Sequence, residues 1–248
     1  MKLHVLTSKA ELKKEQLADK VVIVLDILIA TTSIVTALAN GCKKIVPVRN
    51  YEQALEYQRN PAYTDYKFSG ELNADTLSGF LHPTPLALIE AGMQDAHMVY
   101  CTTNGTVALK DSSSAKEVFV GSLLNAQAIV DHLRENHHEG SVLVVCSGSS
   151  DQFNVEDFYG AGFFVQTFVD TFPPESLDLS DCAQAARIFH ASGDAISMLN
   201  VSRVGKMLNT RGAEHEVVFA AQKNKYPVVP KLSISGHVEL IERKTYAH

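Results

Sequence analysis

Hydroxyl-rich loops follow several apolar runs of this chain. The segment YCTTNGTVALK, residues 100–110, places Thr102, Thr103 and Thr106 directly after one such run. The segments VVIVLDILIATTS and VLVVCSGSS repeat the pattern. Backbone N–H groups at a helix start attract anions, and small residues let a phosphate or carboxylate approach the backbone closely. The loops therefore predict an oxyanion site, although each loop alone could simply cap the next helix.

Four acidic residues could serve chemistry at these loops: Asp26, Glu71, Glu156 and Asp157. Asp26 ends an apolar run, where a carboxylate is unfavourable unless it is paired or binds a metal. Glu156 and Asp157 open a predicted helix, where acids are favoured in any case. Oxygen ligands suit Mg²⁺, which polarises phosphoryl groups and activates water. The acids predict Mg²⁺ chemistry on a phosphate ester, with capping and backbone pairing as the open alternative.

Other phosphate and nucleotide chemistries fail on spacing. A cysteine nucleophile needs an Arg at a fixed distance, where Cys101 has Val107 and Cys146 has Gln152. A haloacid-dehalogenase-type aspartate needs a second acid where this chain has Leu28. The patterns G-x-x-x-x-G-K-[ST], G-x-G-x-x-G and G-x-S-x-G do not occur, so nucleotide-cradle, Rossmann and nucleophile-elbow sites are not predicted.

Composition limits the expected partners and compartment. The chain has 248 residues and a net charge of −6 with scattered Lys and Arg, so we expect no nucleic-acid partner. It has no apolar run of about 18 residues and no signal-peptide core, so we expect no membrane segment and a cytoplasmic location. The widely spaced cysteines are expected to be buried thiols rather than metal ligands. Whether the chain forms a homo-oligomer is left open.

Alternating strand and helix signals must position these residues. Short β-branched runs predict strands at residues 21–27, 44–48, 98–101, 118–120 and 142–146. Helix starts are indicated at Thr31 or Thr32, Asn50, Thr84-Pro85 and Asn125, and His137 and His138 should end an exposed helix. Residues 155–222 read as mostly helical, before a strand at 238–241.

This order predicts an α/β fold, a three-layer α/β/α arrangement with a largely parallel, mixed sheet and a helix-rich C-terminal part. We expect one domain over residues 1–248, with a helical subdomain around residues 174–222. Ligands of such sheets bind beyond the carboxyl ends of the strands. The hydroxyl-rich loops should therefore meet at one edge.

Four motifs in order, VVIVLDILIATTSIVTALANGC, GELN, TTNGTVAL and CSGSSDQFNVEDFYGAG, resemble the 2-phosphosulfolactate phosphatase family of ComB-like proteins. The match covers most of the chain and includes VGKMLNTRG and YPVVP near its end. The resemblance implies a Mg²⁺-dependent phosphatase acting on phosphate esters of small 2-hydroxy acids. In coenzyme M biosynthesis the family's reaction converts phosphosulfolactate to sulfolactate and phosphate.

The resemblance also implies roles for individual residues. Catalysis is expected of Asp26, Glu71 and Asp157, and Mg²⁺ binding of Asp26, Glu71, Glu156 and Asp157. The phosphate and the substrate carboxylate are expected on Thr31, Thr32, Thr102, Thr103, Asn104, Gly105 and Thr106. Water is the expected nucleophile, and the general base is not assigned.

Two segments depart from the family pattern. Ile29 stands where the family segment D-V-L-R-A-T-T has Arg, whose planar group clamps anions by paired hydrogen bonds. The family's G-N-S-P is replaced by HPTP at residues 82–85. Losing one charge-assisted contact is worth about 1.5–3 kcal/mol, so weakened activity and a changed substrate are both open.

Three further side chains are assigned no role at the site. His82 is expected to be incidental. Arg203 and Arg211 could point back to the cleft, but pairing at the surface is favoured. Two alternative functions remain: a degenerate family member that binds small anions without turnover, because of Ile29, and an oxidoreductase on a similar sheet. The missing glycine fingerprint disfavours the oxidoreductase.

Overall fold

The computed structural model describes residues 1–73, 75–136 and 140–241, so His137 and His138 lie outside the described residues. Strands and helices alternate along most of the chain. The strands are β1 (Lys2–Leu6), β2 (Val21–Leu25), β3 (Lys44–Val48), β4 (Lys67–Leu72), β5 (Asp75–Thr76), β6 (His97–Cys101), β7 (Glu117–Gly121), β8 (Ser141–Cys146), β9 (Asp178–Leu179), β10 (Pro230–Leu232) and β11 (Val238–Leu240).

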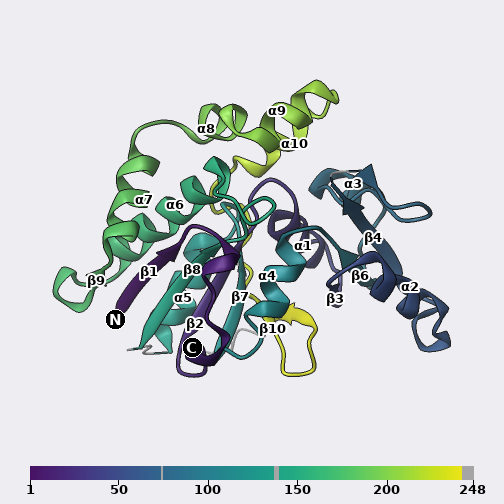
Figure 1. The fold of residues 1–248 in the computed structure, drawn as a ribbon, viewed down its shortest axis with the longest axis horizontal. Helices are drawn as coiled ribbons and strands as arrows, with labels where there is room; N and C mark the ends of the chain where they lie inside the picture. Colours follow the sequence, from purple (N-terminus) through teal and green to yellow (C-terminus); the bar gives the residue numbers. More distant parts are fainter. Residues whose placement is uncertain (74, 137–139, 242–248) are drawn as a thin grey trace, which may run out of the picture.

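The helices cover the sheet on both sides (Figure 1). They are α1 (Ala30–Ala39), α2 (Tyr51–Arg59), α3 (Pro85–Glu90), α4 (Gly105–Asp111), α5 (Ala126–Glu135), α6 (Val155–Thr171), α7 (Asp181–Ala191), α8 (Ala195–Val201), α9 (Arg203–Thr210) and α10 (Glu214–Ala220). The predicted α/β/α architecture with its helix-rich C-terminal part is confirmed. In the described part of the chain, none of the helices is long and apolar enough to span a lipid bilayer.

Strand β2 is apolar on both faces because helices pack against both. All of its residues are buried. Val21, Ile23 and Leu25 join the hydrophobic cluster that contains residues of α5 and α6. Val22 and Val24 join the cluster that contains residues of α1 and α4. The period of two along a strand thus divides one continuous apolar run between two cores.

The sheet consists of two parallel sections joined by an antiparallel hairpin. Its strand order is β5-β4-β6-β3-β11-β10-β7-β2-β8-β1-β9. Neighbours are parallel from β4 to β3 and again from β7 to β9. The β10–β11 hairpin pairs antiparallel with both sections, through Lys231 with Phe119 and Val238 with Ile45. The mixed character of the predicted sheet therefore comes mainly from the C-terminal hairpin.

The C-terminal helices share their core with the sheet. Ala186 of α7, Leu199 of α8, Leu208 of α9 and Val217 of α10 belong to the cluster that includes β1, β2 and β8. A Cβ at Gly162 of α6 would overlap the carbonyl oxygen of Ala186, so α6 and α7 pack at backbone contact. Figure 1 shows α8, α9 and α10 at the top of the view, above α6.

Helix α1 begins earlier than the sequence pattern indicated. Ile29 occupies the N-cap position without a side-chain capping bond, so the prediction that Thr31 or Thr32 caps this helix was wrong. Both threonines lie in the first turn, where their hydroxyls donate to the carbonyl oxygens of Asp26 at 3.0 Å and Ile27 at 2.7 Å. These bonds hold the loop between β2 and α1 in place.

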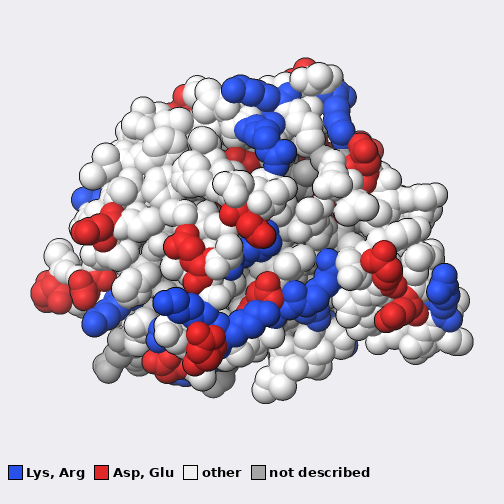
Figure 2. Space-filling view, in the orientation of Figure 1, with Lys and Arg blue, Asp and Glu red and all other residues white. Residues whose placement is uncertain are grey.

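Acidic and basic side chains are interspersed over the face shown in Figure 2. Some of these charges form ion pairs across the surface of the protein: Lys14 and Arg49 both pair with Asp111. Figure 2 shows a band of basic side chains across the lower part of this face, with acidic side chains beside it, and the chain as a whole has a net charge of −6. The absence of a nucleic-acid partner stays a prediction.

Candidate functional site

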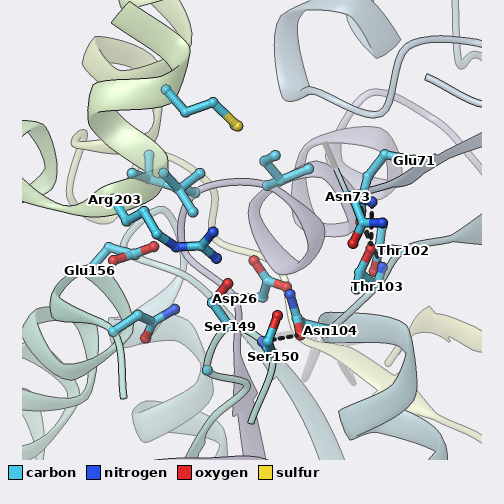
Figure 3. Close-up of a pocket in the computed structure, with 16 residues that line it drawn as sticks. Asp26, Glu71, Asn73, Thr102, Thr103, Asn104, Ser149, Ser150, Glu156 and Arg203 are labelled. Carbon is cyan, nitrogen blue, oxygen red and sulfur yellow. Dashed lines mark hydrogen bonds between the residues drawn. The ribbon is translucent and has the colours of Figure 1, made fainter. Parts of the chain in front are cut away.

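A cavity of about 210 Å³ opens where the chain leaves β2, β6 and β8, opposite α9. Cavities for drug-sized ligands commonly occupy about 300–1,000 Å³, so this one suits a small molecule. Figure 3 shows Asp26 near the middle of the site, with Glu71 on one side and Glu156 and Arg203 on the other. The lining residues are Asp26, Leu28, Ile29, Glu71, Asn73, Thr102, Thr103, Asn104, Gly148, Ser149, Ser150, Asn154, Glu156, Arg203, Val204 and Met207.

The structure brings about half of the predicted site residues to this cavity. Those that line it are Asp26, Glu71, Glu156, Thr102, Thr103 and Asn104. Those that do not are Asp157, Thr31, Thr32, Gly105 and Thr106. The loops after β2, β6 and β8 meet as expected, although β6 lies in the other parallel section of the sheet.

Asp26 directly follows β2 and holds the centre of the site. Its Oδ1 accepts a hydrogen bond of 3.4 Å from the backbone N–H of Ala30. Burial and, to a smaller extent, the carboxylates of Glu71 and Glu156 raise the pKa of Asp26 to about 7, against the effects of the Ala30 N–H and the Lys9 ammonium. A carboxylate surrounded by other acids in this way favours a cation beside it.

Glu71 is held by the loop after β6. Its side chain is 7% exposed, and its carboxylate accepts hydrogen bonds from Thr103 N at 2.6 Å and Thr103 Oγ1 at 3.0 Å. The same Oγ1 accepts a bond of 3.1 Å from Asn73 N. The threonine-rich loop therefore does receive an oxyanion, but that oxyanion is a side chain of the same protein.

The start of α6 leaves two buried oxygen atoms unpaired beside the cavity. Glu156 is 1% exposed, and within the described residues neither its Oε2 nor the Oδ1 of Asn154 has a hydrogen-bond partner. Burial raises the pKa of Glu156, and the positive charge of Arg203 acts in the opposite direction. Two buried acceptors without donors are the pattern that a cation would complete.

Asp157 lies behind the loops, and its geometry argues against the predicted role as catalyst and Mg²⁺ ligand. It is fully buried, its Oδ1 accepts the N–H of Ile27 at 2.8 Å, and its Oδ2 accepts the N–H of Gly148 at 3.2 Å. Burial raises its pKa well above the ordinary range, and Asp26 and Glu156 add to this. Asp157 is a positioning residue that joins the loops after β2 and β8.

Gly105 and Thr106 shape the loop after β6 without reaching the cavity. Thr106 N donates to Thr102 Oγ1 at 3.2 Å, and Thr106 Oγ1 donates to Thr102 O at 2.9 Å. A Cβ at Gly105 would overlap that of Ala30 and lie 2.8 Å from Asp26 Oδ2. Position 105 therefore needs glycine for close packing rather than for ligand binding.

Oxygen donors for a cation are present, but not as a compact acidic cluster. The described residues contain no group of three or more His, Cys, Asp or Glu side chains close enough to hold a metal ion. Mg²⁺ usually keeps several waters and binds through one or two carboxylates together with substrate phosphates. Asp26 and Glu156, with the amide oxygen of Asn154, fit this looser pattern.

Lys9 is a buried cation that the sequence pattern did not reveal. It is 9% exposed, and its Nζ contacts Asn104 Oδ1 at 3.1 Å, Ser147 O at 3.2 Å and Asp151 Oδ1 at 2.9 Å. It thus ties the loops after β6 and β8 together. A capping box between Ser8 and Glu11 marks the turn that carries it, and this was the available signal.

Arg203 is the second cation at the site. It lies at the first position of α9 and extends toward Asp26 in Figure 3, so the prediction that it pairs at the surface was wrong. Within the described residues it forms neither a hydrogen bond nor a salt bridge. Arg211 does pair at the surface, 3.0 Å from Asp75.

The two departures from the family pattern have different positions. Ile29 lines the cavity, whereas His82 does not; its Nδ1 lies 2.9 Å from Thr84 Oγ1. The carbonyl oxygen of Pro83 accepts bonds from Ser33 and Tyr100, behind α1. Only Ile29 therefore changes the ligand environment directly.

The fold and the cavity are those of an α/β protein with a small-molecule-sized cavity beyond the carboxyl ends of its strands, where open α/β sheets bind their ligands. The sequence model of the family described as 2-phosphosulpholactate phosphatase matches residues 6–234. A Clostridium novyi protein named "Probable 2-phosphosulfolactate phosphatase" is 30% identical over 233 residues, 93% of this chain and 97% of that protein. A Symbiobacterium thermophilum protein with the same name is 33% identical over 231 residues, 92% of this chain and 97% of that protein. The chain therefore belongs to the 2-phosphosulfolactate phosphatase family, a family of phosphoric monoester hydrolases, as its motifs indicated.

Proposed function

We propose that this protein is a Mg²⁺-dependent phosphatase that hydrolyses phosphate monoesters of small 2-hydroxy carboxylic acids. The position of Asp26 carries this proposal, because it stands at the centre of the cavity between Glu71 and Glu156. The names of the related proteins support a phosphatase that acts on 2-phosphosulfolactate or a similar ester.

Asp26 and Glu156 would hold the Mg²⁺, with the amide oxygen of Asn154 beside them. Bound there, Mg²⁺ would supply charge neutralisation for the phosphoryl oxygens and activation of water. Arg203, with no ion pair of its own among the described residues, is available for the substrate carboxylate. Ser149 and Ser150 offer hydroxyl groups to the phosphate from the loop after β8.

Glu71 and Asp157 act through the loops. Glu71 fixes Thr103 by two hydrogen bonds, and Asp157 fixes Ile27 and Gly148. Because neither carboxylate needs to move when a ligand binds, the loops around Asp26 are already in position. Such preorganisation avoids the cost of ordering the site during the reaction.

A phosphate-release assay tests the proposal. We expect hydrolysis of phospholactate, phosphoglycolate or phosphosulfolactate that requires Mg²⁺ and stops on addition of a chelator. Asp26→Asn should lower kcat/KM at least about 100-fold while the circular dichroism spectrum stays unchanged, because losing a charged ligand costs more than the 10–100-fold typical of outer-sphere partners.

Asp95→Asn is the matched control, since Asp95 is exposed and pairs with Lys43 at the surface. It should retain wild-type turnover. Full activity in Asp26→Asn would remove Asp26 from the site. No release from any ester would favour the alternative, a family member that binds anions without turnover.

A further inference from the structure

The cavity has two chemically different sides. One side carries the carboxylate, hydroxyl and amide groups described above. The other, the apolar wall, consists of Leu28, Ile29, Val204 and Met207. Leu28 is 3% exposed, and the other three are half-buried. A ligand in this cavity must therefore place an apolar part against one side and polar parts against the other.

Two elements far apart in the sequence build the apolar wall. Leu28 and Ile29 come from the loop between β2 and α1, and Val204 and Met207 come from α9. Positions three or four apart share a helix face, so Arg203 stands beside Met207 on α9. The guanidinium of Arg203 therefore marks the border between the apolar wall and the acidic side.

The charges of the lining residues limit how many anions a ligand can carry. Asp26, Glu71 and Glu156 supply three carboxylates, and Arg203 is the single basic residue lining this cavity among those described. A guanidinium suits one planar carboxylate through paired hydrogen bonds. Lys9 does not line the cavity and is already bonded to Asn104, so a second free anion would meet neutral hydroxyl and amide groups but no second lining cation, and the three carboxylates would repel it.

We propose that the natural substrate is a phosphate ester of a 2-hydroxy acid whose 2-carbon carries, besides the ester oxygen and the carboxylate, a small uncharged alkyl group. Its carboxylate binds Arg203 and its alkyl group packs on the apolar wall. This inference rests on the proposed phosphatase function and narrows it, because it disfavours a sulfonate. In the reaction water adds its oxygen to phosphorus, the ester P–O bond breaks, and the released oxygen takes a proton to form the 2-hydroxy acid.

A substrate comparison tests the inference. The esters are phospholactate, phosphosulfolactate and the phosphate ester of 2-hydroxyisocaproate, whose branched alkyl group is close in size to the sulfonate arm. We expect kcat/KM for the hydroxyisocaproate ester to exceed that for phosphosulfolactate at least about ten-fold. Equal or faster hydrolysis of phosphosulfolactate overturns the inference but leaves the proposed function standing.

If no phosphate is released from any of the esters, the proposed function is contradicted instead. Calorimetric binding of the two free acids then decides the inference without turnover. Tighter binding of 2-hydroxyisocaproate than of sulfolactate supports the apolar wall as its recognition surface. Tighter binding of sulfolactate overturns this assignment.

Variants at Ile29 test the wall itself. Ile29→Arg should reverse the preference and favour phosphosulfolactate, because it adds the missing partner for a second anion. Ile29→Met, which also introduces an unbranched side chain but no charge, is the matched control and should keep the preference for the alkyl ester. An unchanged preference in Ile29→Arg, with binding retained, contradicts the proposal.

The role of Arg203 in binding the substrate carboxylate is tested by comparing the hydrolysis of two esters, with and without a carboxylate. General damage to the fold would lower both rates and leave their ratio unchanged. The wild type should hydrolyse phospholactate about 10–100-fold better than isopropyl phosphate, which lacks the carboxylate. Arg203→Met should abolish this ratio mainly through KM for phospholactate. If the ratio survives in Arg203→Met, the carboxylate binds elsewhere.

Discussion

Asp26 owes its position to residues that never touch the ligand. The hydroxyl oxygen of Thr31 accepts a hydrogen bond of 2.9 Å from the backbone N–H of Asp26, and it donates one of 3.0 Å to the carbonyl oxygen of Asp26. Asp157 holds the next residue, Ile27, through a bond of 2.8 Å. The conformation of the residues around Asp26 is therefore fixed by buried hydrogen bonds, each of which leaves a costly orphan when one partner is removed.

Replacing Asp157 tests this positioning role. Asp157→Ala leaves the N–H groups of Ile27 and Gly148 without their acceptor, which costs about 1–3 kcal/mol per buried donor. Relief of repulsion between Asp157 and its acidic neighbours offsets part of that cost. We expect the free energy of unfolding in urea to fall by about 2 kcal/mol. Asp170→Ala, at an exposed acid of the same helix, should stay within about 0.5 kcal/mol of wild type. Equal stability of the two variants would rule out the role.

Residue types predicted some of the side chains that line the cavity and not others. A carboxylate after an apolar strand is unusual enough to single out Asp26, and this holds in the structure. Thr31 and Thr106 instead satisfy nearby backbone groups, as threonine does in any tight loop. Whether a threonine hydroxyl binds a ligand or bonds to nearby backbone depends on the direction of its side chain, and a sequence pattern does not specify that direction. Lys9 and Arg203 come from segments far from the motifs in sequence, and their place at the site depends on long-range packing that no local pattern specifies.

The loops after β2 and β6 lie close together because the helices that follow them, α1 and α4, start in direct contact. Gly105 at the start of α4 packs against Ala30 at the start of α1, with the carboxylate of Asp26 beside both. The absent side chain at position 105 lets two helix starts, from separate sections of the sheet, approach a single carboxylate. In packing this dense, even one added methyl group displaces its neighbours.

Gly105→Ala should therefore disturb both helix starts. The added Cβ overlaps Ala30 and comes within 2.8 Å of Asp26 Oδ2, so backbone must shift. We expect a loss of about 1–3 kcal/mol in the free energy of unfolding, and a fall in phosphate release larger than the loss of folded protein explains. Gly193→Ala is the control, because its Cβ would meet only the flexible end of Met198 at 3.0 Å. Wild-type turnover in Gly105→Ala would show that this contact does not position Asp26.

Strong periodic elements were predictable, and weak or edge elements were not. The runs that became β2, β3, β6, β7 and β8 are apolar on both faces, which only buried parallel strands require. Strands β4 and β10 are short and contain Lys, Gly or Pro among their residues, so they show no regular pattern of apolar residues that would predict a strand. The antiparallel hairpin that joins the two sections depends on long-range pairing. For that reason the sequence predicted a mixed sheet without predicting where its parallel sections separate.

At the scale of the whole molecule, the C-terminal helices complete the cavity that the sheet begins. Helix α9 contributes Arg203, Val204 and Met207 to the lining, while Leu208 of the same helix is buried in the main core. The position of the apolar wall is therefore linked to the packing of α6 against α7 and of α8 to α10 above them (Figure 1). Anything that loosens the α6–α7 contact should loosen the site.

His190 makes that contact sensitive to pH. Its ring packs on Tyr159 and Phe163 of α6, with Lys223 Nζ 3.5 Å from its Nε2. Burial, aided by the charge of Lys223, lowers its pKa to about 4. In the unfolded chain the pKa is about 6.5, so between these values the unfolded state binds more protons and stability rises with pH. Urea unfolding at about pH 4.5 and pH 7.5 should show a smaller gain in stability for His190→Gln than for the wild type. Identical gains would show that His190 is not the group responsible.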